Sequence, residues 1–100
     1  MSLNIALDEL RATGWTGLDS AGCAFDAEGR SYPTVGRVSR EFAAAGFTFE
    51  LKRLDRFNCV RAEWRDAGGS DTGHVVGQTP EEAAVYALAQ FRRALVGASA

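Results

Sequence analysis

The segment Thr79-Pro80-Glu81-Glu82 constrains the fold most strongly, because it combines the signals that start a helix. Thr79 is a preferred N-cap residue, and Pro80 suits the first helical position. Glu82 lies three residues after the cap, where its carboxylate can complete a capping box. The sequence therefore predicts a helix that begins at Pro80.

The residues that follow carry the period of this helix. Leu88, Phe91 and Leu95 recur at the spacing of one helical face, and Gly97 is expected to end the helix. Apolar residues spaced three or four apart favour another, shorter helix near the start of the chain, ended by Gly14. Thr34 is expected to cap a further helix, which Gly46 ends.

Between these helices the hydrophobic period changes to two. Apolar and polar residues alternate over 47–52 and again over 60–65, and a short third run follows at 74–77. Segment 23–32 is either a small hairpin or a folded-back loop. We therefore predict the α+β class, with a three-stranded antiparallel sheet and helices packed on one face.

Length and composition indicate one domain of an ordinary soluble protein. The chain has 100 residues, of which 46% are hydrophobic and 24% charged. We expect an α-β-β-β-α core over residues 34–96, with residues 1–33 adding an N-terminal helix and loop. No apolar stretch is long enough to span a membrane, and no secretory signal is recognisable, so the cytoplasm is the expected compartment. Cys23 and Cys59 could pair in an oxidising compartment, but buried free thiols fit this compartment better.

Charge is distributed unevenly along the chain. The formal net charge is −2, yet the middle third is basic, with cations at positions 37, 40, 52, 53, 56, 61 and 65. This weakly acidic net charge argues against a dedicated nucleic-acid-binding domain. It does not exclude a local basic patch. No membrane partner is expected.

The order of helices and strands is similar to two known families. One is the double-stranded RNA-binding domain, whose last helix begins with a basic cluster that grips phosphates. Here Glu81 and Glu82 occupy that position and would repel phosphate, so only the topology is retained. The other is the phage ABA-sandwich domain, which the chain resembles over residues 31–96. That resemblance implies a small phage or prophage accessory protein without an assigned activity.

The resemblance to the ABA-sandwich domain rests on three segments. They are Ser31-Tyr32-Pro33-Thr34 before a helix ending at Ala43-Ala44-Ala45-Gly46, the strand Phe47-Thr48-Phe49-Glu50, and Gly77-Gln78-Thr79-Pro80-Glu81-Glu82-Ala83 followed by Ala87-Leu88-Ala89. The family has a cysteine early in its final helix, whereas Tyr86 or a neighbour stands there in this chain.

Candidate partner-binding residues come from two places. If helices cover one face of the sheet, then Thr48, Glu50, Lys52, Arg61, Glu63 and Arg65 point away from them. That pattern is either an ordinary solvated face or a patch for an acidic partner. Trp15, which follows Gly14, is either an exposed anchor or a residue folded back onto the core. The predicted binding residues are Trp15, Lys52, Arg53, Arg56, Arg61 and Arg65.

Few residues are suited to catalysis. His74 is the only histidine, so a cysteine nucleophile would depend on it as the base. Two scattered cysteines and one histidine lack the spacing of a zinc site, and the glycine-rich segment 68–73 lacks the lysine of a phosphate loop. We predict no enzymatic activity, no metal and no cofactor.

These observations favour a noncatalytic protein-protein interaction module, a phage or mobile-element accessory protein that binds or inhibits a host protein or forms a homodimer. The alternative is a weak nucleic-acid-binding protein that uses the basic hairpin Lys52–Arg65, with Phe57 available to stack on a base. A third hypothesis is an enzyme that uses His74 with a cysteine.

Overall fold

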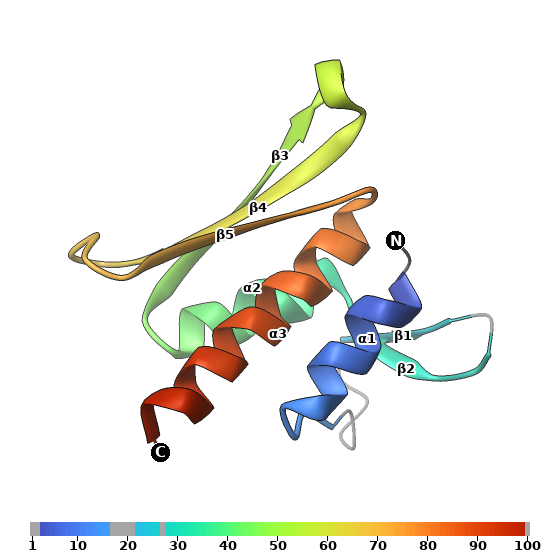
Figure 1. Cartoon of the computed structure of the whole chain (residues 1–100), viewed down its shortest axis with the longest axis horizontal. Coiled ribbons are helices and arrows are strands. Elements are labelled where there is room, and N and C mark those ends of the chain that lie inside the picture. The colour runs from blue at the N-terminus through green and yellow to red at the C-terminus, as the bar shows by residue number, and fades with distance from the viewer. Residues whose placement is uncertain (1–2, 17–21, 27, 100) are drawn as a thin grey trace.

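The computed structural model describes residues 3–16, 22–26 and 28–99, with side chains described as far as residue 94. The fold is α+β, as predicted, and its helices lie on one side of a three-stranded sheet (Figure 1). The elements follow in the order α1 (Leu3–Ala12), β1 (Cys23–Phe25), β2 (Ser31–Pro33), α2 (Val35–Ala44), β3 (Phe47–Leu54), the 3-10 helix η1 (Asp55–Phe57), β4 (Cys59–Asp66), β5 (Thr72–Gly77) and α3 (Pro80–Ser99).

The start of α3 confirms the predicted capping box. The backbone N–H of Glu82 donates to Thr79 Oγ1 at 3.1 Å, and Glu82 Oε2 accepts from the backbone N–H of Gln78 at 3.3 Å. The predicted end at Gly97 was wrong, because α3 continues through it to Ser99. A single glycine costs a helix only about 1 kcal/mol relative to alanine, so it does not by itself stop one.

Helix α2 also begins and ends where the sequence predicts. Thr34 Oγ1 accepts from the backbone N–H of Arg37 at 3.2 Å, which satisfies one orphan donor of the first turn. At the other end, the N–H of Gly46 donates to the carbonyl of Ala43 at 3.0 Å. Gly46 has a φ of 86°, a left-handed conformation that favours glycine.

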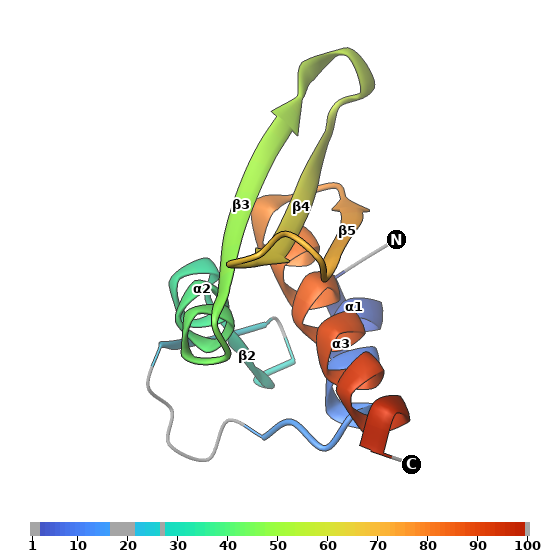
Figure 2. The same ribbon diagram turned by 90° about the vertical axis from the view of Figure 1, so that its left-hand side faces the viewer.

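The larger sheet is an antiparallel meander in the order β3-β4-β5. Strands β3 and β4 pair along their whole length, from Phe47 opposite Asp66 to Leu54 opposite Cys59. Strand β5 is shorter, and its last pair joins Gly77 to Val60. The β3–β4 hairpin therefore extends beyond β5, and its tip stands away from the helices (Figures 1 and 2).

The core lies between this sheet and the helices. Phe42 of α2 is fully buried, and its ring centroid lies 5.0 Å from that of Phe49, 4.8 Å from Phe91 and 5.4 Å from Trp64. Helix α1 packs against α3 and adds Leu7 and Leu10, both fully buried. The N-terminal segment therefore shares one core with residues 34–96.

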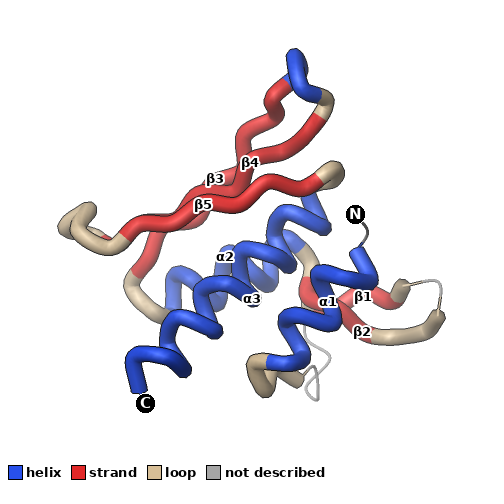
Figure 3. Tube along the Cα trace, viewed as in Figure 1, coloured by secondary structure: helices blue, strands red, loops and turns tan. Residues whose placement is uncertain are grey.

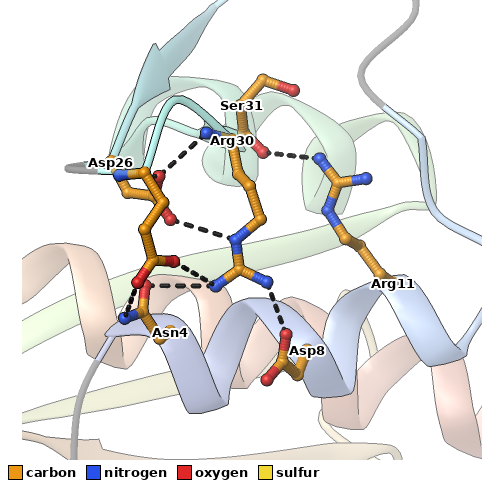
Figure 4. Close-up of polar contacts among 7 residues, drawn as sticks. Asn4, Asp8, Arg11, Asp26, Arg30 and Ser31 are labelled. Carbon is orange, nitrogen blue, oxygen red and sulfur yellow. Dashed lines mark hydrogen bonds and ion pairs between the residues drawn. The ribbon is translucent and has the colours of Figure 1, made fainter.

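Segment 23–32, left open by the sequence between a hairpin and a loop, forms the two-stranded hairpin β1–β2. Arg30 ties it to α1, because its guanidinium contacts Asp8 at 2.6 Å, Asp26 at 3.2 Å and Asn4 at 3.1 Å (Figure 4). Burial tends to raise the pKa of Asp26, but hydrogen bonds from two backbone N–H groups and from Arg30 outweigh it and lower that pKa.

Two further sequence-based expectations concern membranes and thiols. Within the described segments, none of the helices is both long and apolar enough to cross a bilayer. Cys23 lies in the small sheet and Cys59 in the large one, and no disulfide joins them. Both are partly exposed, so the prediction of buried thiols was wrong.

Candidate binding surface on the outer sheet face

The sheet face opposite the helices is not covered by any described segment of the chain (Figures 2 and 3). Alternation along each strand places every second side chain on this face. We call it the outer face, and it consists of Thr48, Glu50, Lys52, Arg61, Glu63, Arg65, Thr72, His74 and Val76. The predicted separation of a core face from a bare face is therefore confirmed.

Strand register arranges these residues in rows that cross the sheet. Glu50, Glu63 and His74 form an acidic row, in which the two glutamates lie directly opposite each other. The neighbouring row is basic, because Lys52 lies opposite Arg61, with Val76 beyond it on β5. A third row contains Thr48, Arg65 and Thr72. Like charges are therefore paired across β3 and β4 twice in succession.

Glu63 partly compensates the basic row. Its Oε1 lies 3.4 Å from Lys52 Nζ and 3.4 Å from Arg61 Nε. Neither Glu50 nor Arg65 forms an ion pair within the described part of the chain. Ion pairs this exposed contribute about 0–1 kcal/mol, so the outer face adds little to stability.

The outer face is hollowed rather than flat. A depression of about 180 Å³ is lined by polar and charged side chains from all three strands, together with Trp64 and Gly73. A Cβ at position 73 would lie 2.3 Å from a ring carbon of Trp64, so this strand position requires glycine. The buried tryptophan and the glycine therefore fit together within the sheet below the charged residues.

The connection between β4 and β5 holds the third strand in register. Asp66 Oδ1 accepts from the backbone N–H of Ser70 at 2.9 Å, and Oδ2 accepts from its hydroxyl at 3.0 Å. The N–H of Asp71 also donates to Oδ1, at 3.3 Å. That bond is the main cause that lowers the pKa of Asp66, with Ser70 and Gly69 adding to it against a smaller opposing effect of burial.

The β3–β4 connection differs from this turn, because it exposes a large apolar side chain to solvent. Helix η1 and Asn58, which has a φ of 50°, make a compact turn closed by a bond from the Asn58 N–H to the Asp55 carbonyl at 3.2 Å. Phe57 is 71% exposed, and Arg53 and Arg56 are also exposed. We call Arg53, Asp55, Arg56 and Phe57 the hairpin tip.

The structure separates the residues predicted to bind a partner. Lys52, Arg61 and Arg65 lie on the outer face, while Arg53 and Arg56 lie at the hairpin tip. Trp15 belongs to neither, since it is only 4% exposed and its Nε1 donates to Glu41 Oε2 at 3.0 Å. We therefore correct Trp15 from a partner-binding residue to a core residue, because an exposed anchor cannot be buried and hydrogen-bonded.

Residues suited to catalysis are not brought together. His74 is exposed on β5 opposite Glu63, whereas Cys59 lies four residues away along β4, about 13 Å of strand. Cys23 lies in the other sheet. The described residues contain no cluster of three or more histidine, cysteine or acidic side chains that could hold a metal.

No family model matches this chain, and the searches of curated proteins and of solved structures found nothing similar to it. The resemblance to the phage ABA-sandwich domain stays a prediction.

Three residues of the outer face, Thr72, His74 and Val76, are not recognisable as such from the sequence. The sequence predicts a third strand that starts only at His74, and so short a run shows no clear alternation. Register with β4 supplies the assignment.

Proposed function

We propose that this protein is a noncatalytic protein-protein interaction module that binds its partner through the outer face. As the sequence predicts, we take it to be a small phage or mobile-element accessory protein that acts on a host protein in the cytoplasm. The observation that carries the proposal is a hollowed sheet face that no described segment covers, on which like charges lie opposite each other.

The pairing of like charges supports this interpretation. Like charges directly opposite each other destabilise an antiparallel pair. A face that served solubility alone could place Glu50 opposite a cation, since β3 and β4 both carry cations. Instead, Glu50 faces Glu63 and Lys52 faces Arg61. Such an arrangement suits a partner that brings the opposite charge to the cations of the face.

The dimensions of the face limit what can occupy it. Strands β3 and β4 have eight residues each and β5 has six. With strands about 4.8 Å apart, the face is about 14 Å wide and at most about 26 Å long, so its area is at most roughly 360 Å². A stable dimer buries about 800 Å² on each partner, so a second copy docked on this face alone would bury too little. A single helix, about 10–12 Å across, matches the width of the face.

The charges of the outer face indicate which side chains the partner helix should carry. The outer face holds three cations, Lys52, Arg61 and Arg65, and two carboxylates, one of which already contacts two of the cations. The occupant we propose is therefore a partner helix of about 17 residues with acidic side chains along the buried stripe. The small area indicates a transient complex.

A pair of designed peptides tests this proposal. One is a helix of about 17 residues with glutamates at positions i, i+4, i+7 and i+11, and the other has the same composition in scrambled order. Each is titrated into isotope-labelled protein and followed by NMR. The patterned peptide is expected to shift the amide signals of β3, β4 and β5, and the scrambled peptide is expected to bind at least several-fold more weakly.

Two cations form a matched pair of controls. Lys52 and Arg93 have side chains 56% and 59% exposed, and each contacts one carboxylate, Glu63 and Glu9 respectively. Lys52→Gln is expected to weaken peptide binding about two- to fivefold, the effect of one exposed ion pair, whereas Arg93→Gln leaves it unchanged. Equal losses in both variants, no shifts at about millimolar peptide, or a dimer that dissociates in Lys52→Gln would each overturn the proposal.

A further inference from the structure

The hairpin tip has a chemistry that the outer face lacks. Four side chains of large apolar residues are more than 45% exposed among those described, namely Ile5 at 49%, Phe25 at 68%, Phe57 at 71% and Val76 at 46%. Phe57 is the most exposed of them, and it belongs to η1 at the end of the hairpin. The hairpin extends past β5 (Figure 2). No other exposed large apolar side chain lies at the tip.

Two arginines lie within four residues of Phe57 in the chain. Arg53 and Arg56 are exposed, and neither forms an ion pair with any residue that the structure describes. Asp55 is the one carboxylate of the tip. Lys52 and Arg61 lie further along the hairpin, on the outer face. The tip thus combines one exposed aromatic ring with unpaired guanidinium groups.

We propose that the hairpin tip binds single-stranded nucleic acid, with Phe57 stacked on one base and Arg53 and Arg56 on the flanking phosphates. Sites that bind single strands without sequence preference combine these two components, a ring for stacking and cations along the backbone. The bases of a duplex are already stacked on one another, so a lone ring has no face to contact there.

An apolar protein pocket fits the tip less well. The buried centre of a protein interface is depleted in charge and brings several apolar side chains together. The exposed residues near Phe57 in the chain are charged or polar, namely Arg53, Asp55, Arg56 and Asn58. Docking the ring in an apolar pocket would therefore also remove water from charged groups, which costs free energy. Base stacking buries the ring face and leaves those groups in water.

The test uses a fluorescent oligothymidylate of about 12 nucleotides and the full chain, with binding followed by anisotropy. Two phosphate contacts predict that affinity falls roughly sevenfold between about 50 and 200 mM salt. Phe57→Ala is expected to weaken binding at least about fivefold, and Phe57→Trp is expected to retain it, because stacking depends on an aromatic face.

Phe25→Ala is the matched control, since Phe25 is an equally exposed phenylalanine on β1 without the arginines of the tip. It is expected to bind the oligonucleotide as the unmodified protein does. No binding at about 50 mM salt, equal losses in Phe57→Ala and Phe25→Ala, or tighter binding of a duplex of the same length would overturn the proposal. Binding of the acidic peptide at the outer face is measured separately and does not depend on Phe57.

Discussion

The two faces of β4 differ in what determines their residues, although these residues alternate along one strand. Toward the helices, Ala62 and Trp64 are buried against α2 and α3, whereas Arg61 and Glu63 on the other side remain partly exposed. The inner face is specified by packing, since Trp64 meets Phe42 and leaves no room for a side chain at position 73. The fold is therefore stabilised from one side, and the other side is left to carry charges that folding does not require.

The largest effect that tests this difference comes from two adjacent residues. Trp64→Ala is expected to lower the free energy of unfolding by about 3–5 kcal/mol, because it removes a large buried side chain and leaves a cavity. Arg65→Ala, one position along the same strand, is expected to change it by no more than about 0.5 kcal/mol. Urea unfolding at neutral pH measures both. Comparable losses in the two variants would show that both faces support the fold.

Much of this asymmetry could be predicted from the sequence. The alternation of Val60, Ala62 and Trp64 with charged residues defines both faces of β4 by its period alone. The caps at Thr34 and Thr79 likewise act within a few residues, and both helices begin where these residues predict. Signals that act locally are recognisable without knowledge of the tertiary structure.

The remaining features depend on contacts between distant segments. Trp15 lies 26 residues before Glu41, so nothing near it in the chain indicates the bond that holds it in the core. The pairing of Glu50 with Glu63 depends on the register of β3 and β4, which the length of the connection sets. The tie between Arg30 and Asp8 is of the same kind.

A smaller effect is expected at the β4–β5 connection, which holds the edge of the outer face. The pKa of Asp66 is lowered below its ordinary value of 3.8, so its carboxylate adds stability above that pH. This contribution is lost as the pH falls from 3.8 through the lower pKa of the folded state. Asp66→Asn is therefore expected to be less stable at pH 7, with the difference disappearing in strong acid.

Thermal unfolding across pH 2 to about 7 checks this expectation. Asp71→Asn is the matched control, because Asp71 is exposed in the same turn and its side chain accepts none of the bonds described for Asp66. A stability difference between the unmodified protein and Asp66→Asn that persisted unchanged at pH 2 would mean that the carboxylate charge does not hold this connection.

The smallest effect, and the one most specific to the outer face, is expected at Glu50. Neutralising it in Glu50→Gln removes a like-charge pair with Glu63 and is expected to raise the free energy of unfolding by about 0.2–0.5 kcal/mol. Glu81→Gln is the control of opposite sign, because an exposed carboxylate in the first turn of α3 favours the helix dipole. Added salt should reduce both changes. If Glu50→Gln instead destabilised the protein, Glu50 would be explained by folding, and its position opposite Glu63 would no longer support a partner on this face.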